Sequence, residues 1–237
     1  MERDYSHRRK EIESRFKWYH SDKSEREELI SPSGNFCLTI DSYSTGKNTW
    51  AYTRGRVRRV GSRKLIADIK RNFSHFWYSW IQHSNGNEYL LCGEDYQGQT
   101  VINLTRGTTN NFFPDSGHEG HGFCWTAAFP SPDSKIIAVD GCYWACPYEI
   151  VFFDFSNPDE LPYREYLRVS DQIGSDGWLD DNNFKLTREI EVRKADGRPY
   201  EELSDDEQDE LDENSDLSEH IKQEVTVTRR QIFKDSE

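Results

Sequence analysis

The stretch that decides the fold is HEGHGFCWTAAFPSPDSKIIAVDGCYWACPYEIVFFDF, residues 118–155. Runs of β-branched and aromatic residues alternate in it with turn-forming segments, which favours short strands. We expect strands at 124–129, 135–139 and 149–155, with SPDS at 131–134 as the first turn. Three strands joined by tight connections predict an antiparallel meander.

The segment at 72–104 follows the same plan. Asn85-Gly86 is a strong hairpin signal, because both central residues of the favoured two-residue turn need positive φ. Aromatic and aliphatic residues flank it on both sides. Similar strand and turn patterns occur at 29–43 and, more weakly, at 177–198, so the chain contains three to four copies of one unit.

The turns of these copies recur at nearly constant spacing. Gly34, Gly86, Ser134 and Asn182 occupy corresponding positions, 52, 48 and 48 residues apart. In the first three copies an acid follows the second strand and a tyrosine follows the acid within three residues. A period of about 45–50 residues with several strands per unit is typical of propeller-like sheets.

The turn, strand and acid pattern in SPSGNFCLTID and SPDSKIIAVD resembles the WD-repeat and related propeller families. The resemblance covers roughly 30–198 and lacks the Trp-Asp ending. DGCYWACPYE, followed by FFDFSNPDELP, is also similar to an uncharacterised WD-repeat-like family. This resemblance implies an all-β, propeller-like architecture of repeated antiparallel meanders and no known chemistry.

Charge divides the 237-residue chain into four parts. We expect a charged N-terminal arm at 1–29, a β-repeat domain at 30–199, and an acidic linker at 200–219. Residues 201–219 hold 11 acidic and no Lys or Arg side chains, out of a net charge of −13 for the whole chain, so we expect disorder there. Alternating residues at 220–237 predict a last strand that could close the sheet.

Targeting signals are not evident in the sequence. No run reaches the about 18–20 apolar residues that a membrane helix needs, and the N-terminus has no apolar signal core. We therefore expect a cytoplasmic or nuclear protein without membrane contact. In such a reducing compartment the five cysteines are free thiols or metal ligands.

A cluster of histidines and cysteines raises the possibility of zinc. Imidazole and thiolate are zinc ligands, and the candidates are His118, His121, Cys124, Cys142 and Cys146. The C-x3-C spacing departs from common zinc motifs. We therefore expect loop histidines and structural thiols with no cofactor. The alternative is a metal-binding domain or a metal-dependent enzyme.

A basic segment at 54–71 raises the possibility of nucleic-acid binding. Asp68 is the single acidic residue among its cations, and aromatic residues follow the segment. This combination is suited to phosphate contact and base stacking. The candidates are Arg54, Arg56, Arg58, Arg59, Arg63 and Lys64. The other interpretation is an internal or partner-facing patch.

Loop aromatics point to protein recognition, because Tyr and Trp dominate interface hot spots. The sequence predicts a binding rim of Asp41, Tyr43, Asp95, Tyr96, Asp140, Tyr143 and Trp144. The alternative is that these aromatics cap the core at the sheet rims. Our leading prediction is a non-catalytic protein-interaction module with a protein partner.

Overall fold

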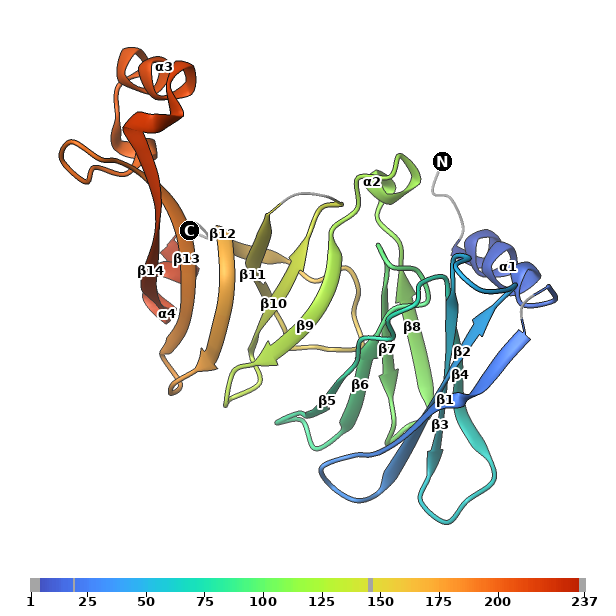
Figure 1. Ribbon diagram of the computed structural model, residues 1–237. Helices are drawn as coiled ribbons and strands as arrows, with labels where there is room; N and C mark the ends of the chain where they lie inside the picture. The colour runs from blue at the N-terminus through green and yellow to red at the C-terminus, as the bar shows by residue number, and fades with distance from the viewer. Residues whose placement is uncertain (1–4, 19, 145–146, 235–237) are drawn as a thin grey trace.

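The computed structural model describes residues 5–18, 20–144 and 147–234, which form three antiparallel sheets in chain order (Figure 1). The first sheet comprises β1 (His20–Ile30), β2 (Phe36–Ser44), β3 (Tyr52–Arg59) and β4 (Leu65–Arg71). The second comprises β5 (Ser79–Gln82), β6 (Glu88–Cys92), β7 (Gln99–Asn103) and β8 (Thr108–Phe112). The third comprises β9 (Cys124–Pro130), β10 (Ile136–Cys142), β11 (Tyr148–Asp154), β12 (Glu165–Trp178), β13 (Asn183–Arg193) and β14 (Ser218–Thr228).

The helices are short. They are α1 (Tyr5–Arg15), α2 (Asp115–His118), α3 (Asp205–Glu213) and α4 (Arg229–Lys234), with single 3-10 turns at Tyr200–Glu202 and Ser215–Leu217. None of the helices in the described part of the chain is long and apolar enough to cross a membrane. The all-β class and the propeller-like succession of antiparallel meanders are therefore confirmed.

Three of the four aligned turn residues share a left-handed backbone, but Asn182 does not. Asn85 also lacks positive φ, so the Asn85-Gly86 connection is not the two-residue turn that the sequence predicts. Gly34, Gly86 and Ser134 all have positive φ, at 75°, 84° and 59°. The first and third turns also share a hydrogen bond: the hydroxyls of Ser31 and Ser131 each accept from the backbone N–H five residues later, at 3.1 and 3.0 Å. The segment at 177–198 differs, because its strands join the third sheet rather than forming a fourth.

The second sheet is buried on both faces: every residue of β7 and all but the first residue of β6 are buried. Alternate side chains of β6 point in opposite directions. Leu90 packs with Leu38 and Val57 of the first sheet, whereas Leu91 packs with the third sheet. The three sheets therefore stack through two apolar interfaces.

The third sheet curls until its later strands cover its own outer face. The register between β11, β12 and β13 shifts at several points, and such irregularities bend strands. The bend brings the Phe184 ring within 5.2 Å of Phe152 on β11 and 6.0 Å of Phe129 on β9. Val227 of β14 and Ile232 of α4 complete this cluster.

Two segments are more ordered than the sequence predicts. The expected arm at 1–29 contains α1 and β1, and β1 pairs with β2. The acidic linker expected to be disordered forms α3 between two 3-10 turns. Leu211 of α3 is buried, and Glu207 accepts ion pairs from Arg193 and Arg198 of the preceding hairpin, so long-range cations offset the acidic charge.

The last segment forms the strand that the sequence predicts, and this strand extends the third sheet at its edge. β14 pairs with β13 at the outer edge of the third sheet, and it makes no pairing with the first sheet (Figure 1). The described sheets consequently form an open stack with two end faces.

Candidate functional site

Four aromatic side chains from all three sheets converge on one surface. Trp50 lies in the β2–β3 loop, Phe73 between β4 and β5, Tyr96 in the β6–β7 loop, and Trp144 in the β10–β11 loop. We call this set the aromatic cluster. Because successive loops of a meander alternate between its two ends, loops at equivalent places in stacked sheets come together.

The two indoles of the aromatic cluster are largely open to solvent. Trp144 is 56% exposed and Trp50 is 51% exposed. The Trp144 ring lies 5.8 Å from Tyr96, 6.3 Å from Phe73 and 6.4 Å from Trp50, measured between centroids. Large apolar side chains gathered in this way form a patch of the kind that marks interaction surfaces.

A buried polar network holds the aromatic cluster in place. Asn72 connects its parts: its carbonyl accepts from the Trp50 indole at 2.9 Å, and its side-chain oxygen accepts from the Tyr96 backbone at 3.0 Å. The Asn72 amide donates to Asp95 at 2.7 Å. Asp95 is completely buried and also accepts from Arg8 of α1 at 2.7 Å. The surface rings are therefore anchored to a fixed interior.

Only part of the predicted rim lies at this surface. Tyr96 and Trp144 belong to the aromatic cluster, but Asp41 and Asp95 are completely buried, which corrects their placement on an exposed rim. Tyr43 packs against Phe16 at 5.0 Å. Elsewhere, the Tyr143 ring packs on Phe123 at 5.4 Å. The acids were predicted as loop residues, whereas Asp41 and Asp140 lie within strands and Asp95 is an internal hydrogen-bond acceptor.

The sequence interpretation missed Trp50 and Phe73. It selected tyrosines that follow an acid, and these two rings instead lie just before a strand and just after one. The available signal was the position of Trp50 in the turn-rich STGKNTW loop, where a large aromatic has no strand to pack into. Phe73 gave no such signal, because alternation within 72–80 is equally consistent with a core residue.

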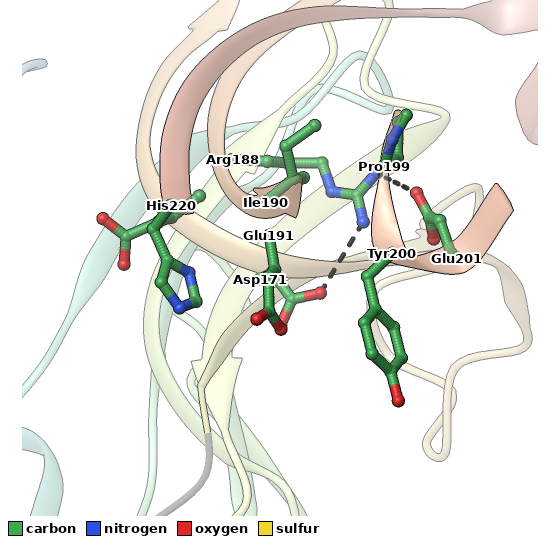
Figure 2. Close-up of a pocket in the computed structure, with 9 residues that line it drawn as sticks. Asp171, Arg188, Ile190, Glu191, Pro199, Tyr200, Glu201 and His220 are labelled. Atoms are coloured by element: carbon green, nitrogen blue, oxygen red, sulfur yellow. Dashed lines mark ion pairs between the residues drawn. The ribbon is translucent and has the colours of Figure 1, made fainter. Parts of the chain in front are cut away.

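Apart from the aromatic cluster, a hollow lies in the third sheet where β12, β13 and β14 run side by side. One part has a volume of about 610 Å³ and another about 230 Å³, and both are lined by Asp171, Glu189 and His220. Figure 2 shows Arg188 extending between Asp171 and Glu201, with N–O distances of 3.6 and 3.5 Å. We call this hollow the acidic groove.

Asp140 lies in the wider part of the acidic groove. One carboxylate oxygen accepts from Gln172 at 3.2 Å, and the other is buried and accepts no hydrogen bond within the described residues. Burial raises the pKa of Asp140 to about 6, because desolvation disfavours the charged form. Near neutral pH, Asp140 can thus take up a proton or accept a hydrogen bond from a donor group of a ligand.

The described histidines and cysteines do not assemble a metal site. No group of three or more His, Cys, Asp or Glu side chains placed to hold a metal occurs within 5–18, 20–144 and 147–234. His118 packs on the Phe113 ring, and Cys124 is buried opposite Cys142 in the β9–β10 register. Burial raises the pKa of Cys124 to about 12, so its thiol stays protonated. Cys146 lies outside the described residues.

The basic segment is largely neutralised by partners. Arg54 pairs with Asp68 at 2.6 Å, Arg56 pairs with Asp41, and Arg58 pairs with Glu28. At the end of β3, the Arg59 guanidinium lies 5.0 Å from the Phe36 ring centroid. Among the predicted cations, Arg63 and Lys64 are exposed in the β3–β4 turn. These ion pairs favour the alternative interpretation, an internal patch.

The chain matches one curated protein closely enough to show its family. It is 34% identical over 188 residues to the uncharacterized protein R762 of Acanthamoeba polyphaga mimivirus, a match that covers 76% of this chain and 74% of that protein. The chain belongs to the R762 family. No protein-family model matches it. An uncharacterised family with propeller-like sheets agrees with the resemblance in the sequence.

Two solved structures that match this chain are β-propellers, and their similarity to it is low. The β-propeller domain of Cps50 (Swd1) from Myceliophteria thermophila has a TM-score of 0.38 at 12% identity, covering 71% of this chain. Hsv2 from Kluyveromyces lactis has a TM-score of 0.37 at 11% identity, and the match covers 84% of this chain and 72% of the Hsv2 chain. The chain spans 46% of the Cps50 domain's length.

Proposed function

We propose that this member of the R762 family is a non-catalytic module that binds a protein partner through the aromatic cluster. The observation that carries the proposal is the joint exposure of Trp50 and Trp144 on a surface to which all three sheets contribute. Tryptophan and tyrosine provide large contact area with few rotatable bonds, and they are enriched in interface hot spots.

The anchoring of the aromatic cluster supports the same proposal. The hydrogen bonds through Asn72 and the buried Asp95 fix the loops before a partner arrives. Preorganised loops lose less conformational entropy on binding, which improves affinity. Burial, with a contribution from the nearby Asp95, raises the pKa of Tyr96, so its ring stays neutral and suits an apolar contact.

The experiment compares binding by wild type, Trp144→Ala and Trp50→Ala, with Trp18→Ala as the matched control. Trp18 is 72% exposed and lies outside the aromatic cluster, after α1. Partners recovered by affinity purification are identified, expressed and titrated against each variant. We expect each cluster substitution to weaken binding by about 2 kcal/mol, roughly 30-fold, and the control to bind as wild type.

Two results would count against the proposal. One is equal affinity of wild type and Trp144→Ala for every partner recovered. The other is an equal loss with Trp18→Ala, which would show nonspecific binding to exposed indoles. Far-UV circular dichroism of each variant confirms that lost binding does not reflect lost folding.

A further inference from the structure

The outer edge of the third sheet carries an unpaired strand. β14 pairs with β13 along eleven residues, and within the described residues no other strand pairs with it (Figure 1). Such an edge presents N–H and C=O groups that can hydrogen-bond to another strand. Long edges of this kind are sites of strand addition.

The two faces of β14 carry different side chains. Val227 belongs to the apolar cluster on the outer face of the third sheet, and Val225 packs against it. The odd-numbered residues of β14 therefore share that face. Lys222 and Glu224 therefore share the opposite face. Ile221 lies on the apolar face beyond the cluster and remains 40% exposed.

We propose that β14 pairs antiparallel with β14 of a second copy of this chain, about a two-fold axis at Gln223. In this register Lys222 lies opposite Glu224 of the second copy, and Glu224 lies opposite Lys222 of the second copy. Opposite charges directly across an antiparallel pair are stabilising. On the other face, Ile221 meets Val225 of the second copy, which extends the apolar cluster across the interface.

The charge pattern selects this register over its neighbours. A two-fold axis perpendicular to the sheet places the apolar faces of the two copies on the same side. The axis must therefore pass through a residue of β14, and the neighbouring registers have it at the residue before or after Gln223. A centre at Lys222 would place two lysines opposite each other, and a centre at Glu224 would place two glutamates opposite each other. The interface at Gln223 is self-complementary, as a two-fold dimer requires.

The test is sedimentation velocity of the full chain over a concentration series that reaches about 100 µM. We expect wild type to interconvert between monomer and dimer. Lys222→Glu and Glu224→Lys should each weaken the dimer by about tenfold, because two like-charged pairs replace two attractive ones. Lys135→Glu, a reversal of an exposed charge in the β9–β10 turn, should leave the dimer unchanged.

Mixing the variants makes the test specific to the register. An equimolar mixture of Lys222→Glu and Glu224→Lys should form a heterodimer, since each 222–224 pair again carries opposite charges. The double variant Lys222→Glu/Glu224→Lys should dimerise as wild type does. Glu224→Lys also removes an ion pair with Lys185 at 3.1 Å, so circular dichroism must show native folding.

Three outcomes would overturn the proposal. The first is a wild-type monomer at every concentration. The second is a dimer that survives both single charge reversals. The third is a mixture that associates no better than its components, which would place any dimer interface elsewhere.

Discussion

The two end faces of the sheet stack are covered by different chemistry. On the outer face of the first sheet, Cys37, Thr39 and Asp41 of β2 are buried beneath charged side chains, chiefly arginines. On the outer face of the third sheet, the equivalent strand β10 presents Ile136 and Ala138 to a cluster of aromatic and aliphatic side chains. One end is closed by ion pairs and the other by an apolar cap.

The difference shows how a short series of repeats can end. In a stack of repeats each unit buries its face against the next, so terminal units need a cap. The first sheet keeps the repeat pattern and covers its polar residues with Arg26, Arg56 and Arg58. The third sheet instead gains β12, β13 and β14, which curl over its apolar face. The ends should therefore respond differently to substitution and to salt.

The apolar end should show the largest loss on substitution. Phe184 is completely buried and contacts the rings of Phe129, Phe152 and Trp178. We expect Phe184→Ala to lower the free energy of unfolding by about 3–5 kcal/mol, because it removes apolar contacts and leaves a cavity. Urea denaturation followed by circular dichroism measures this change.

Leu179→Ala is the control for this substitution. Leu179 is 59% exposed and lies in the turn before β13, so its loss should stay within about 0.5 kcal/mol. If Phe184→Ala cost no more than the control, β13 would not be a structural cap of the third sheet.

The charged end should show a smaller loss that depends on salt. Asp41 is completely buried and accepts from Arg26 at 2.6 Å and from Arg56. Asp41→Asn leaves both guanidinium groups without a counter-charge. Because these arginines are 45% and 28% exposed, we discount the loss for solvent screening to about 2 kcal/mol.

The matched control here is Asp68→Asn, which removes the exposed pair with Arg54 on the same sheet. It should cost less than about 1 kcal/mol. Urea denaturation at low and high NaCl should show the stability gap between wild type and Asp41→Asn narrowing with salt, while the gap for Phe184→Ala stays constant. Equal salt responses would contradict the distinction between the two ends.

The repeat and its turns were predictable because they depend on local rules. Positive φ at Gly34, Gly86 and Ser134 follows from turn chemistry that a few adjacent residues determine. The membership of β1 in the first sheet was not predictable from composition. Edge strands carry charges that hinder aggregation, so the segment SDKSEREE resembles an exposed arm.

The aromatic cluster was predictable only in part. Tyr96 and Trp144 occupy corresponding loops of the repeat, which the spacing revealed. Their contact with Trp50 and Phe73 depends on how three sheets stack, and no local pattern encodes that packing. The order of α3 likewise depends on Arg193 and Arg198, cations that belong to a different segment from the acidic run.

Asp140 gives the sharpest contrast, because, like Asp41, it is an acid near the end of the strand that follows a repeated turn, but it has no arginine partner among the described residues. The acids and bases facing it in the acidic groove are Asp171, Glu189 and His220. Its pKa of about 6 lies above the value of about 3.9 expected in the unfolded chain, so the folded state binds more protons between these values. Stability from Asp140 is thus fully present below about pH 4 and is lost as pH rises through about 6.

The same substitution should therefore have opposite signs at the two ends. Asp140→Asn removes the cost of burying a charge, and Gln172 keeps an oxygen acceptor, so we expect about 2 kcal/mol of added stability at pH 7. At pH 4 the variant and wild type should be nearly equal. Urea denaturation at both pH values measures the difference, with Asp41→Asn destabilised at pH 7. A destabilised Asp140→Asn at pH 7 would mean that the carboxylate has a stabilising partner, and the two end faces would then follow the same rule.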